Sequence, residues 1–238
     1  MSGKHIVKAF DEDLRNISSR IAEMGGLAEE QLGSAIEALR NRDSELAAEI
    51  IHADKRLDRM EVQLERSSVE VMALRQPMAA DLREVVAALK IASALERIGD
   101  LAKNVAKRTL ILNQSPPLRV ISSIVRMGKQ TQTLTAEALD AYTARDTALA
   151  VSVWKRDIEI DEMHNSIFRE LITYMMEDPR TIGLCSQLLF VTKNFERIGD
   201  HTTFIAEMTY YAVEGQTIGE DRPKSNDLSE IPLAGSDG

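Results

Sequence analysis

Apolar residues recur at alternating steps of three and four along most of the chain, the spacing of α-helices that pack by one face. In the first half this pattern predicts three helices, and a proline, Pro77, is expected in the first turn of the third. Breaks are expected near residues 41–43, 76–77 and 113–117. The apolar positions of the three runs are Phe10, Leu14, Ile17, Ile21, Met24 and Ala28; Leu46, Ile50, Ala53, Leu57, Met60, Leu64 and Val71; and Ile91, Leu95, Ile98, Ala102 and Val105.

The second half of the chain repeats this plan. Helices are predicted over about residues 119–143, 146–176 and 179–213. Asp178 is expected to cap the last of them, with Pro179 at its first helical position. Helices of 30–35 residues are about 45–50 Å long. Six of them in two groups of three predict an elongated all-α molecule.

An internal repeat relates the two halves. The pentapeptide Glu-Arg-Ile-Gly-Asp stands at residues 96–100 and again at 196–200. Further matches surround it, since Asp54 and Asp58 correspond to Asp157 and Asp161, and Pro77 corresponds to Pro179. The probability that any two pentapeptides in a chain of this length match by chance is roughly one per cent, so duplication is the better explanation. The predicted fold is therefore two tandem, sequence-related three-helix bundles, at residues 1–112 and 118–214.

Pairs of acidic residues provide the candidate chemistry. Each pair is four residues apart, so its members share one face of a helix beside the apolar stripe. Antiparallel packing of the second and third helices of a half would bring two such pairs together, and like charges in one place need a compensating cation. Carboxylate oxygens favour ions such as Mg²⁺, Mn²⁺, Ca²⁺ or iron. The first acidic site is Asp54, Asp58, Glu96 and Asp100; the second acidic site is Asp157, Asp161, Glu196 and Asp200.

Two further features bear on these sites. Gly99 and Gly199 stand inside predicted helices, where glycine costs about 1 kcal/mol relative to alanine, so a close backbone approach or an open site is expected there. His164 follows Asp161 by three residues and is a further candidate ligand, although Glu61 takes its place in the first half. His201 is expected to point away from the second acidic site.

Two other interpretations of the acids stay open. In the first, the chain is a purely structural helical scaffold, in which Arg97 and Arg197 neutralise the acids through ion pairs. In the second, it is a carboxylate-bridged di-metal oxidase. Such an enzyme needs Glu-x-x-His on each of two helices, and only Asp161-x-x-His164 comes near that pattern.

Composition narrows the range of protein classes. The chain has 238 residues, a formal net charge of −9 and 4% aromatic residues, which disfavours nucleic acid as the main partner. Its one cysteine, Cys185, is expected in the core, and together with the lack of a membrane span or secretory signal it predicts a cytoplasmic protein. Residues 215–238 carry five acids and two bases among Gly, Pro and Ser, which predicts a disordered acidic tail.

Several longer motifs resemble one known family. They are Leu-Arg-Gln-Pro-Met-Ala-Ala-Asp-Leu-Arg at 74–83, the stretch 89–104 around the first pentapeptide, Glu-Asp-Pro-Arg at 177–180, and Lys-Asn-Phe-Glu-Arg-Ile-Gly-Asp-His at 193–201. Together they are similar to the PhoU family of phosphate-transport accessory regulators over about residues 5–214. The resemblance implies two three-helix bundles and places metal ions (Mg, Mn, Fe or Zn) on the two acidic sites.

The resemblance also implies a function. Members of the family are non-enzymatic negative regulators of the phosphate-starvation response and of phosphate uptake, which couple a phosphate ABC transporter to a sensor histidine kinase. It further implies a homodimer that meets the membrane only through its partners. One departure stands out: Phe204 occupies the position where the family usually has asparagine, as Asn104 does in the first half. Because phenylalanine supplies no oxygen ligand, the second acidic site is expected to differ from the first.

Overall fold

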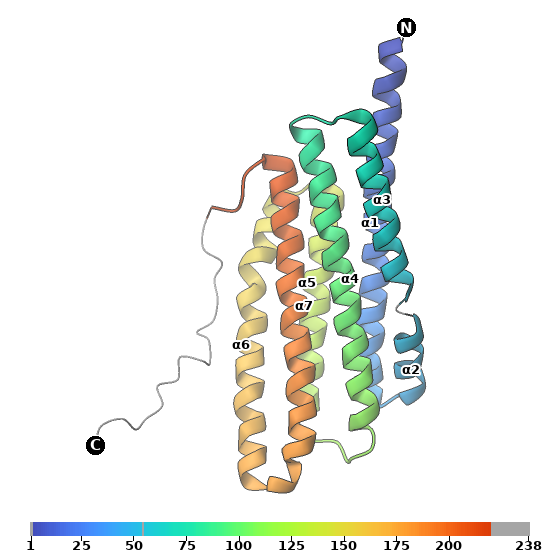
Figure 1. Ribbon diagram of the computed structural model, residues 1–238. Helices are drawn as coiled ribbons and strands as arrows, with labels where there is room; N and C mark the ends of the chain where they lie inside the picture. The colour runs from blue at the N-terminus through green and yellow to red at the C-terminus, as the bar shows by residue number, and fades with distance from the viewer. Residues whose placement is uncertain (1, 54, 220–238) are drawn as a thin grey trace, which may run out of the picture.

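The computed structural model describes residues 2–53 and 55–219, and every regular element in this part of the chain is helical (Figure 1). Seven α-helices and one 3₁₀ turn follow one another. They are α1 (Ser2–Asn41), α2 (Ser44–Ala53), α3 (Lys55–Arg75), α4 (Ala80–Leu112), α5 (Ile121–Ala144), α6 (Thr147–Glu177), the turn η1 (Pro179–Thr181) and α7 (Ile182–Glu214).

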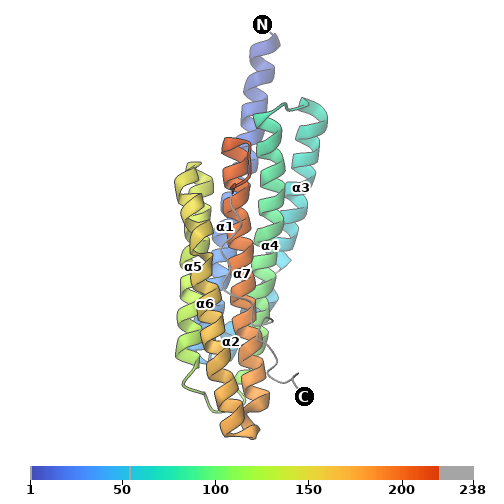
Figure 2. The ribbon, with the colours of Figure 1, turned by 90° about the vertical axis from the view of Figure 1, so that its left-hand side faces the viewer.

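The long helices run side by side along one axis and give an elongated molecule, as the two perpendicular views show (Figures 1 and 2). Helices α1 to α4 form one half and α5 to α7 the other, and α4 packs against α7 where the halves meet. Buried apolar side chains of both halves join in one core, to which Leu95 contributes from α4 and Phe195 from α7. The predicted all-α fold with two three-helix units is confirmed, while the boundaries at 112 and 118 stay a prediction.

The second predicted helix is described in two parts. The apolar run from Leu46 to Val71 predicts one continuous helix, and the structure describes α2, which ends at Ala53, and α3, which begins at Lys55. The periodic pattern survives because Ile50 and Leu57 are both buried on the same core. Position 54, between the two helices, lies outside the described residues.

The two proline signals have different outcomes. The Asp178 carboxylate accepts a hydrogen bond from the Arg180 amide, and Pro179 opens the 3₁₀ turn that leads into α7, so the predicted cap is confirmed. The prediction for Pro77 is wrong, because α4 begins only at Ala80. Gln76 and Ala79, on either side of Pro77, have φ angles of 49° and 48°. These left-handed residues turn the chain before the helix starts, and Pro77 lies in the connection.

The corner after the first helix of each half repeats as well. Arg42 and Arg145 both adopt left-handed backbone conformations, with φ angles of 57° and 55°. The aspartate that follows each arginine caps the next helix: Asp43 accepts hydrogen bonds from two backbone amides, and Asp146 accepts one. The same dipeptide thus ends one helix and starts another in both halves, which extends the duplication to the connections.

Arg42 also ties its corner to the far end of α4. One of its guanidinium nitrogens, Nη2, donates to the backbone oxygens of Asn113 and Ser115 at 2.9 and 2.7 Å. The side chain of Asn113 in turn donates to the Arg42 carbonyl oxygen at 2.9 Å. These bonds satisfy carbonyl groups that a helix end leaves without partners.

We expect the substitution Arg42→Ala to lower the free energy of unfolding by about 2–3 kcal/mol, because it removes charge-assisted hydrogen bonds and leaves half-buried carbonyls unpaired. Urea denaturation of both proteins measures the change. Arg40→Ala is the matched control, since Arg40 makes one exposed ion pair with Glu37 and its loss should cost at most about 1 kcal/mol. Equal losses from the two variants would contradict the role given to Arg42.

Candidate functional site

The first acidic site is built from α3 and α4. Glu96 and Asp100 lie one turn apart on α4, half-buried, and Asp58 lies exposed on α3. Burial is the largest cause that raises the pKa of Glu96 above its ordinary 4.5, and the negative charges of Asp100, Glu61 and Asp58 add to it. Acids of α3 and α4 are therefore near enough for their charges to interact. Asp54, the fourth member, lies outside the described residues.

Basic side chains of α4 neutralise part of this charge. Arg97 lies 3.4 Å from Glu96 through Nε and 3.7 Å from Asp100 through Nη1, and Lys103 pairs with Asp100. The first acidic site thus includes the ion pairs that the scaffold interpretation expects of Arg97. Lys103 was not anticipated as a partner, although its spacing of three residues from Asp100 is the signal that finds it.

The second acidic site contains one fully buried acid. Asp157 of α6 is only 2% exposed. The side chain of Glu196 on α7 is 16% exposed, close to the 14% of Glu96 in the first site. Asp161 and Asp200 are half-buried on the same two helices. The charges of Asp200 and Asp157 both act on Glu196, so acids of α6 and α7 face one another here as well.

The carboxylate of Glu196 is only partly satisfied. Its Oε1 accepts a hydrogen bond from Lys193 Nζ at 2.8 Å, while its buried Oε2 accepts none from the described residues. Burial is the largest cause that raises the pKa of Glu196, and Asp200 and Asp157 raise it further, against the lowering effect of Lys193. A buried carboxylate oxygen beside two other acids favours either a proton or a bound cation.

This raised pKa gives the metal-free protein a defined pH dependence. A carboxyl group whose pKa is higher in the folded state than its ordinary 4.5 favours folding while it is protonated, and it opposes folding once the pH rises through both values. Glutamine mimics the protonated form. We therefore expect Glu196→Gln to be more stable than the wild type at pH 7 and equally stable below pH 4.5, by urea denaturation across that range in chelator. A variant less stable than the wild type at pH 7 would contradict this.

The two helical glycines allow the close approaches that the sequence predicts. A Cβ atom at Gly199 would lie 3.0 Å from Asp157 Oδ1, so the buried carboxylate rests against the backbone of α7. At Gly99 the neighbour is Leu57, whose Cδ1 would overlap a Cβ atom, and the Gln31 side chain donates a hydrogen bond to the Gly99 carbonyl at 3.1 Å. The two corresponding glycines therefore contact different residue types: Gly199 packs against the acid Asp157, and Gly99 packs against the apolar Leu57.

The remaining side chains near the second acidic site have clear roles. His164 has a pKa lowered to about 4 by burial and by Lys193, so its ring is neutral at pH 7. His201 is half-buried, and its pKa is lowered mainly by burial, with Asp200 opposing the shift. Phe204 packs against the core and supplies no ligand. Elsewhere in this half, Cys185 is buried, as predicted. Trp154 is buried as well, and its indole donates to Glu207 at 2.9 Å.

The carboxylate oxygens of the two acidic sites are suitable ligands for a hard cation, but those that the structure describes are not arranged around a common point. Within residues 2–53 and 55–219, no three His, Cys, Asp or Glu side chains are grouped closely enough to hold a metal ion. Lysines occupy part of the space, since Lys103 and Lys193 bind one acid in each half. A metal ion would require these lysines to turn away and the carboxylates of the paired helices to converge.

No helix in the described ranges has the length and apolar character that a membrane span needs.

The fold and the two sites define a class of protein: a duplicated, all-helical molecule that carries one set of facing acids in each half. A family model described as "PhoU domain" matches it twice, at residues 21–109 and 124–209. A phosphate-specific transport system accessory protein PhoU homolog from Caulobacter vibrioides (strain NA1000 / CB15N) is 49% identical over 228 residues, which are 95% of this chain and 99% of the relative. The chain belongs to the PhoU family.

Other relatives agree. The phosphate-specific transport system accessory protein PhoU of Escherichia coli (strain K12) is 39% identical over 236 residues, 98% of this chain and 96% of that protein. The crystal structure of PhoU from Pseudomonas aeruginosa superposes with a TM-score of 0.85 at 38% sequence identity. The match covers 87% of this chain and 100% of the chain in that crystal structure. These relatives are named accessory or regulatory proteins, and the PhoU family to which the chain belongs is non-enzymatic. The prediction of a non-enzymatic protein is therefore confirmed, and the oxidase interpretation is not retained.

Proposed function

We propose that this chain is a cytoplasmic negative regulator of the phosphate-starvation response and of phosphate uptake. In this role it couples a phosphate ABC transporter to a sensor histidine kinase. The observation that carries the proposal is the similarity over nearly the whole chain to proteins named as accessory to the phosphate-specific transport system. Long helices with broad polar faces provide surfaces on which helices of other proteins can pack.

We further propose that both acidic sites bind metal ions through their carboxylates. Three features support this: acids of paired helices face one another, the pKa of Glu96 and of Glu196 is raised, and Glu196 has a buried oxygen without a hydrogen-bond donor. A bound cation would supply the positive charge that the lysines now supply only in part. The second acidic site is the more enclosed of the two, because Asp157 is buried against α7.

The regulatory role is tested by deleting the gene and following a phosphate-starvation reporter at high phosphate. We expect the reporter to be switched on in the deletion strain and to be repressed again by the wild-type gene on a plasmid. A reporter that stays off after deletion would overturn the regulatory role. The same strain, complemented with Glu96→Gln, Asp100→Asn, Glu196→Gln and Asp200→Asn together, then shows whether repression depends on the acids.

The proposal includes a homodimer. Exposed apolar side chains, among them Phe190 and Ile182 on α7, leave surface that association can bury. Sedimentation equilibrium gives the mass directly. A species at twice the chain mass of 26.5 kDa supports the dimer, and a single species at the chain mass contradicts it.

A further inference from the structure

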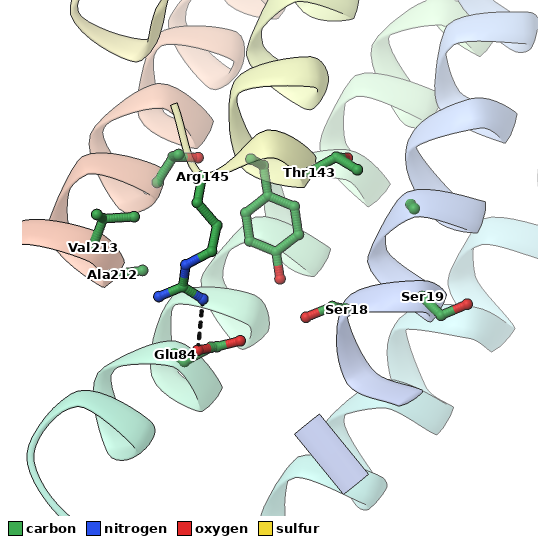
Figure 3. Close-up of a pocket in the computed structure, with 10 residues that line it drawn as sticks. Ser18, Ser19, Glu84, Thr143, Arg145, Ala212 and Val213 are labelled. Carbon is green, nitrogen blue, oxygen red and sulfur yellow. Dashed lines mark hydrogen bonds and ion pairs between the residues drawn. The ribbon is translucent and has the colours of Figure 1, made fainter. Parts of the chain in front are cut away.

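Away from both acidic sites, a pocket of about 280 Å³ lies where α1, α4, α5 and α7 come together (Figure 3). Ser18 and Ala22 line it from α1, Glu84 from α4, and Ala212 and Val213 from the last turn of α7. Arg145, at the end of α5, closes one side and forms an ion pair with Glu84 at 2.8 Å. Hydroxyl-bearing side chains, among them Tyr142 and Thr209, complete the lining. Most of the exposed wall area is nevertheless apolar, with the ion pair beside it, which suits an apolar side chain that has an acid next to it.

The chain leaves the helical body at the edge of this pocket. Val213 lines the pocket, and Gly215, with a φ angle of 77°, ends α7 two residues later. Arg83, the neighbour of Glu84, packs on this exit, since a Cβ atom at Gly215 would lie 3.0 Å from its guanidinium carbon. Arg83 Nε is buried and has no hydrogen-bond partner among the described residues. Beyond the exit, Ile218 is half-buried, so the chain is still against the protein surface there.

The segment that follows carries apolar side chains of a suitable kind. Residues 220–238 lie outside the described residues, and their sequence is mostly polar except for Leu228–Leu233, which reads Leu-Ser-Glu-Ile-Pro-Leu. Leu228 lies thirteen positions after Gly215. Thirteen residues reach at most about 45 Å when fully extended, so the connection is long enough for the segment to return to the pocket that the last turn of α7 lines. Tethering makes the local concentration of the segment about millimolar.

We propose that the segment Leu228–Leu233 of the same chain docks in this pocket. Ile231, together with Leu228 and Leu233, supplies the apolar groups that the mostly apolar wall area would contact. The carboxylate of Glu230, within the segment, would meet the arginines at the rim, of which Arg145 has a side chain that is 53% exposed. A guanidinium has five donors, so Arg145 can keep Glu84 and still bind a second acid.

The test uses the full chain with p-benzoylphenylalanine in place of Ile231, irradiated and mapped by mass spectrometry. Mixing ¹⁴N- and ¹⁵N-labelled chains distinguishes links within a chain from links between chains. We expect links within one chain to residues 18–22, 142–145 and 209–213, above the level given by the same probe in place of Asp237. Links concentrated elsewhere, links between chains, or a yield no higher than that control would overturn the proposal.

A pocket variant makes the test specific. Ala22→Arg places a long side chain at the mouth of the pocket from an exposed position, and we expect it to abolish the links. Gly26→Arg is the matched control, because position 26 is exposed on the same helix and a Cβ atom there meets nothing within 4 Å. It should leave the yield unchanged, with circular dichroism to show that both variants remain helical. Unchanged links in Ala22→Arg would contradict the assignment.

Discussion

Replacing Glu196 by glutamine and Asp200 by asparagine together is expected to weaken metal binding to the second acidic site by at least about 10–100-fold. Substitutions of residues that only support a ligand already have effects of that size, and these carboxylates are proposed as ligands themselves. The amides keep the shape of the side chains, so helix packing should be retained. Isothermal titration with Mn²⁺, after treatment with chelator, measures the change in affinity.

A control is available on the same pair of helices. Glu162 and Glu170 are exposed on α6, and changing both to glutamine removes the same amount of charge away from the site. This control should retain the wild-type affinity. If both double variants weaken Mn²⁺ binding equally, the effect is one of overall charge and the second acidic site has no special role.

The largest expected loss of stability follows from Phe195→Ala, which should lower the free energy of unfolding by about 3–5 kcal/mol. Phe195 is fully buried on α7, and its ring packs where Gly128 leaves the backbone of α5 bare: a Cβ atom there would lie 2.9 Å from the ring's Cζ. Neither α5 nor α7 can close the resulting cavity without moving as a whole. Denaturation in guanidinium chloride measures the loss.

Phe190→Ala is the comparison for this prediction. Phe190 is on the same helix but 52% exposed, with the Arg108 guanidinium 4.6 Å from its ring centre. Its loss should cost about 0.5–1 kcal/mol, the value of an exposed cation–π contact. A smaller loss for Phe195 than for Phe190 would mean that α5 and α7 are not packed as described.

Much of the fold follows from local signals that act within one or two turns. The three- and four-residue spacing marks nearly every helix, and Asp178 with Pro179 marks the start of the last one, because capping and a fixed proline φ are local effects. Pro77 misleads for the same reason. The residues with positive φ on either side of it turn the chain, so α4 begins only at Ala80. Glutamine and alanine rarely adopt a positive φ, so neither Gln76 nor Ala79 indicates this turn in the sequence.

The acidic sites were predictable as faces but not as detailed geometry. Spacing places Glu96 with Asp100 and Glu196 with Asp200, and antiparallel packing then brings the acids of the neighbouring helix to them. The basic side chain that forms an ion pair with each acid is decided by rotamers and burial. Glu196 therefore pairs with Lys193 rather than with Arg197. The unequal exposure of Asp58 and its counterpart Asp161, which is half-buried, arises from the tertiary packing of α3 and α6 and leaves no signal in the repeat itself.

The asymmetry between the halves indicates how the two sites should differ. In the second half Asp157 rests on α7 beside a glycine, and Phe204 packs in the core where the first half has Asn104. The first acidic site is more exposed and keeps ion pairs with Arg97 and Lys103. We therefore expect the first site to exchange metal ions more readily, since its ligands are open to water and to competing cations.

Elemental analysis tests the central claim, that facing acids in each half bind metal ions. Four proteins purified without chelator and dialysed against equal metal are compared: the wild type, Glu96→Gln with Asp100→Asn, Glu196→Gln with Asp200→Asn, and all four substitutions together. We expect each half variant to lose part of the bound metal and the combined variant to hold none. Equal metal in the wild type and the combined variant, or none in either, would contradict it and leave a helical scaffold with salt-bridged acids.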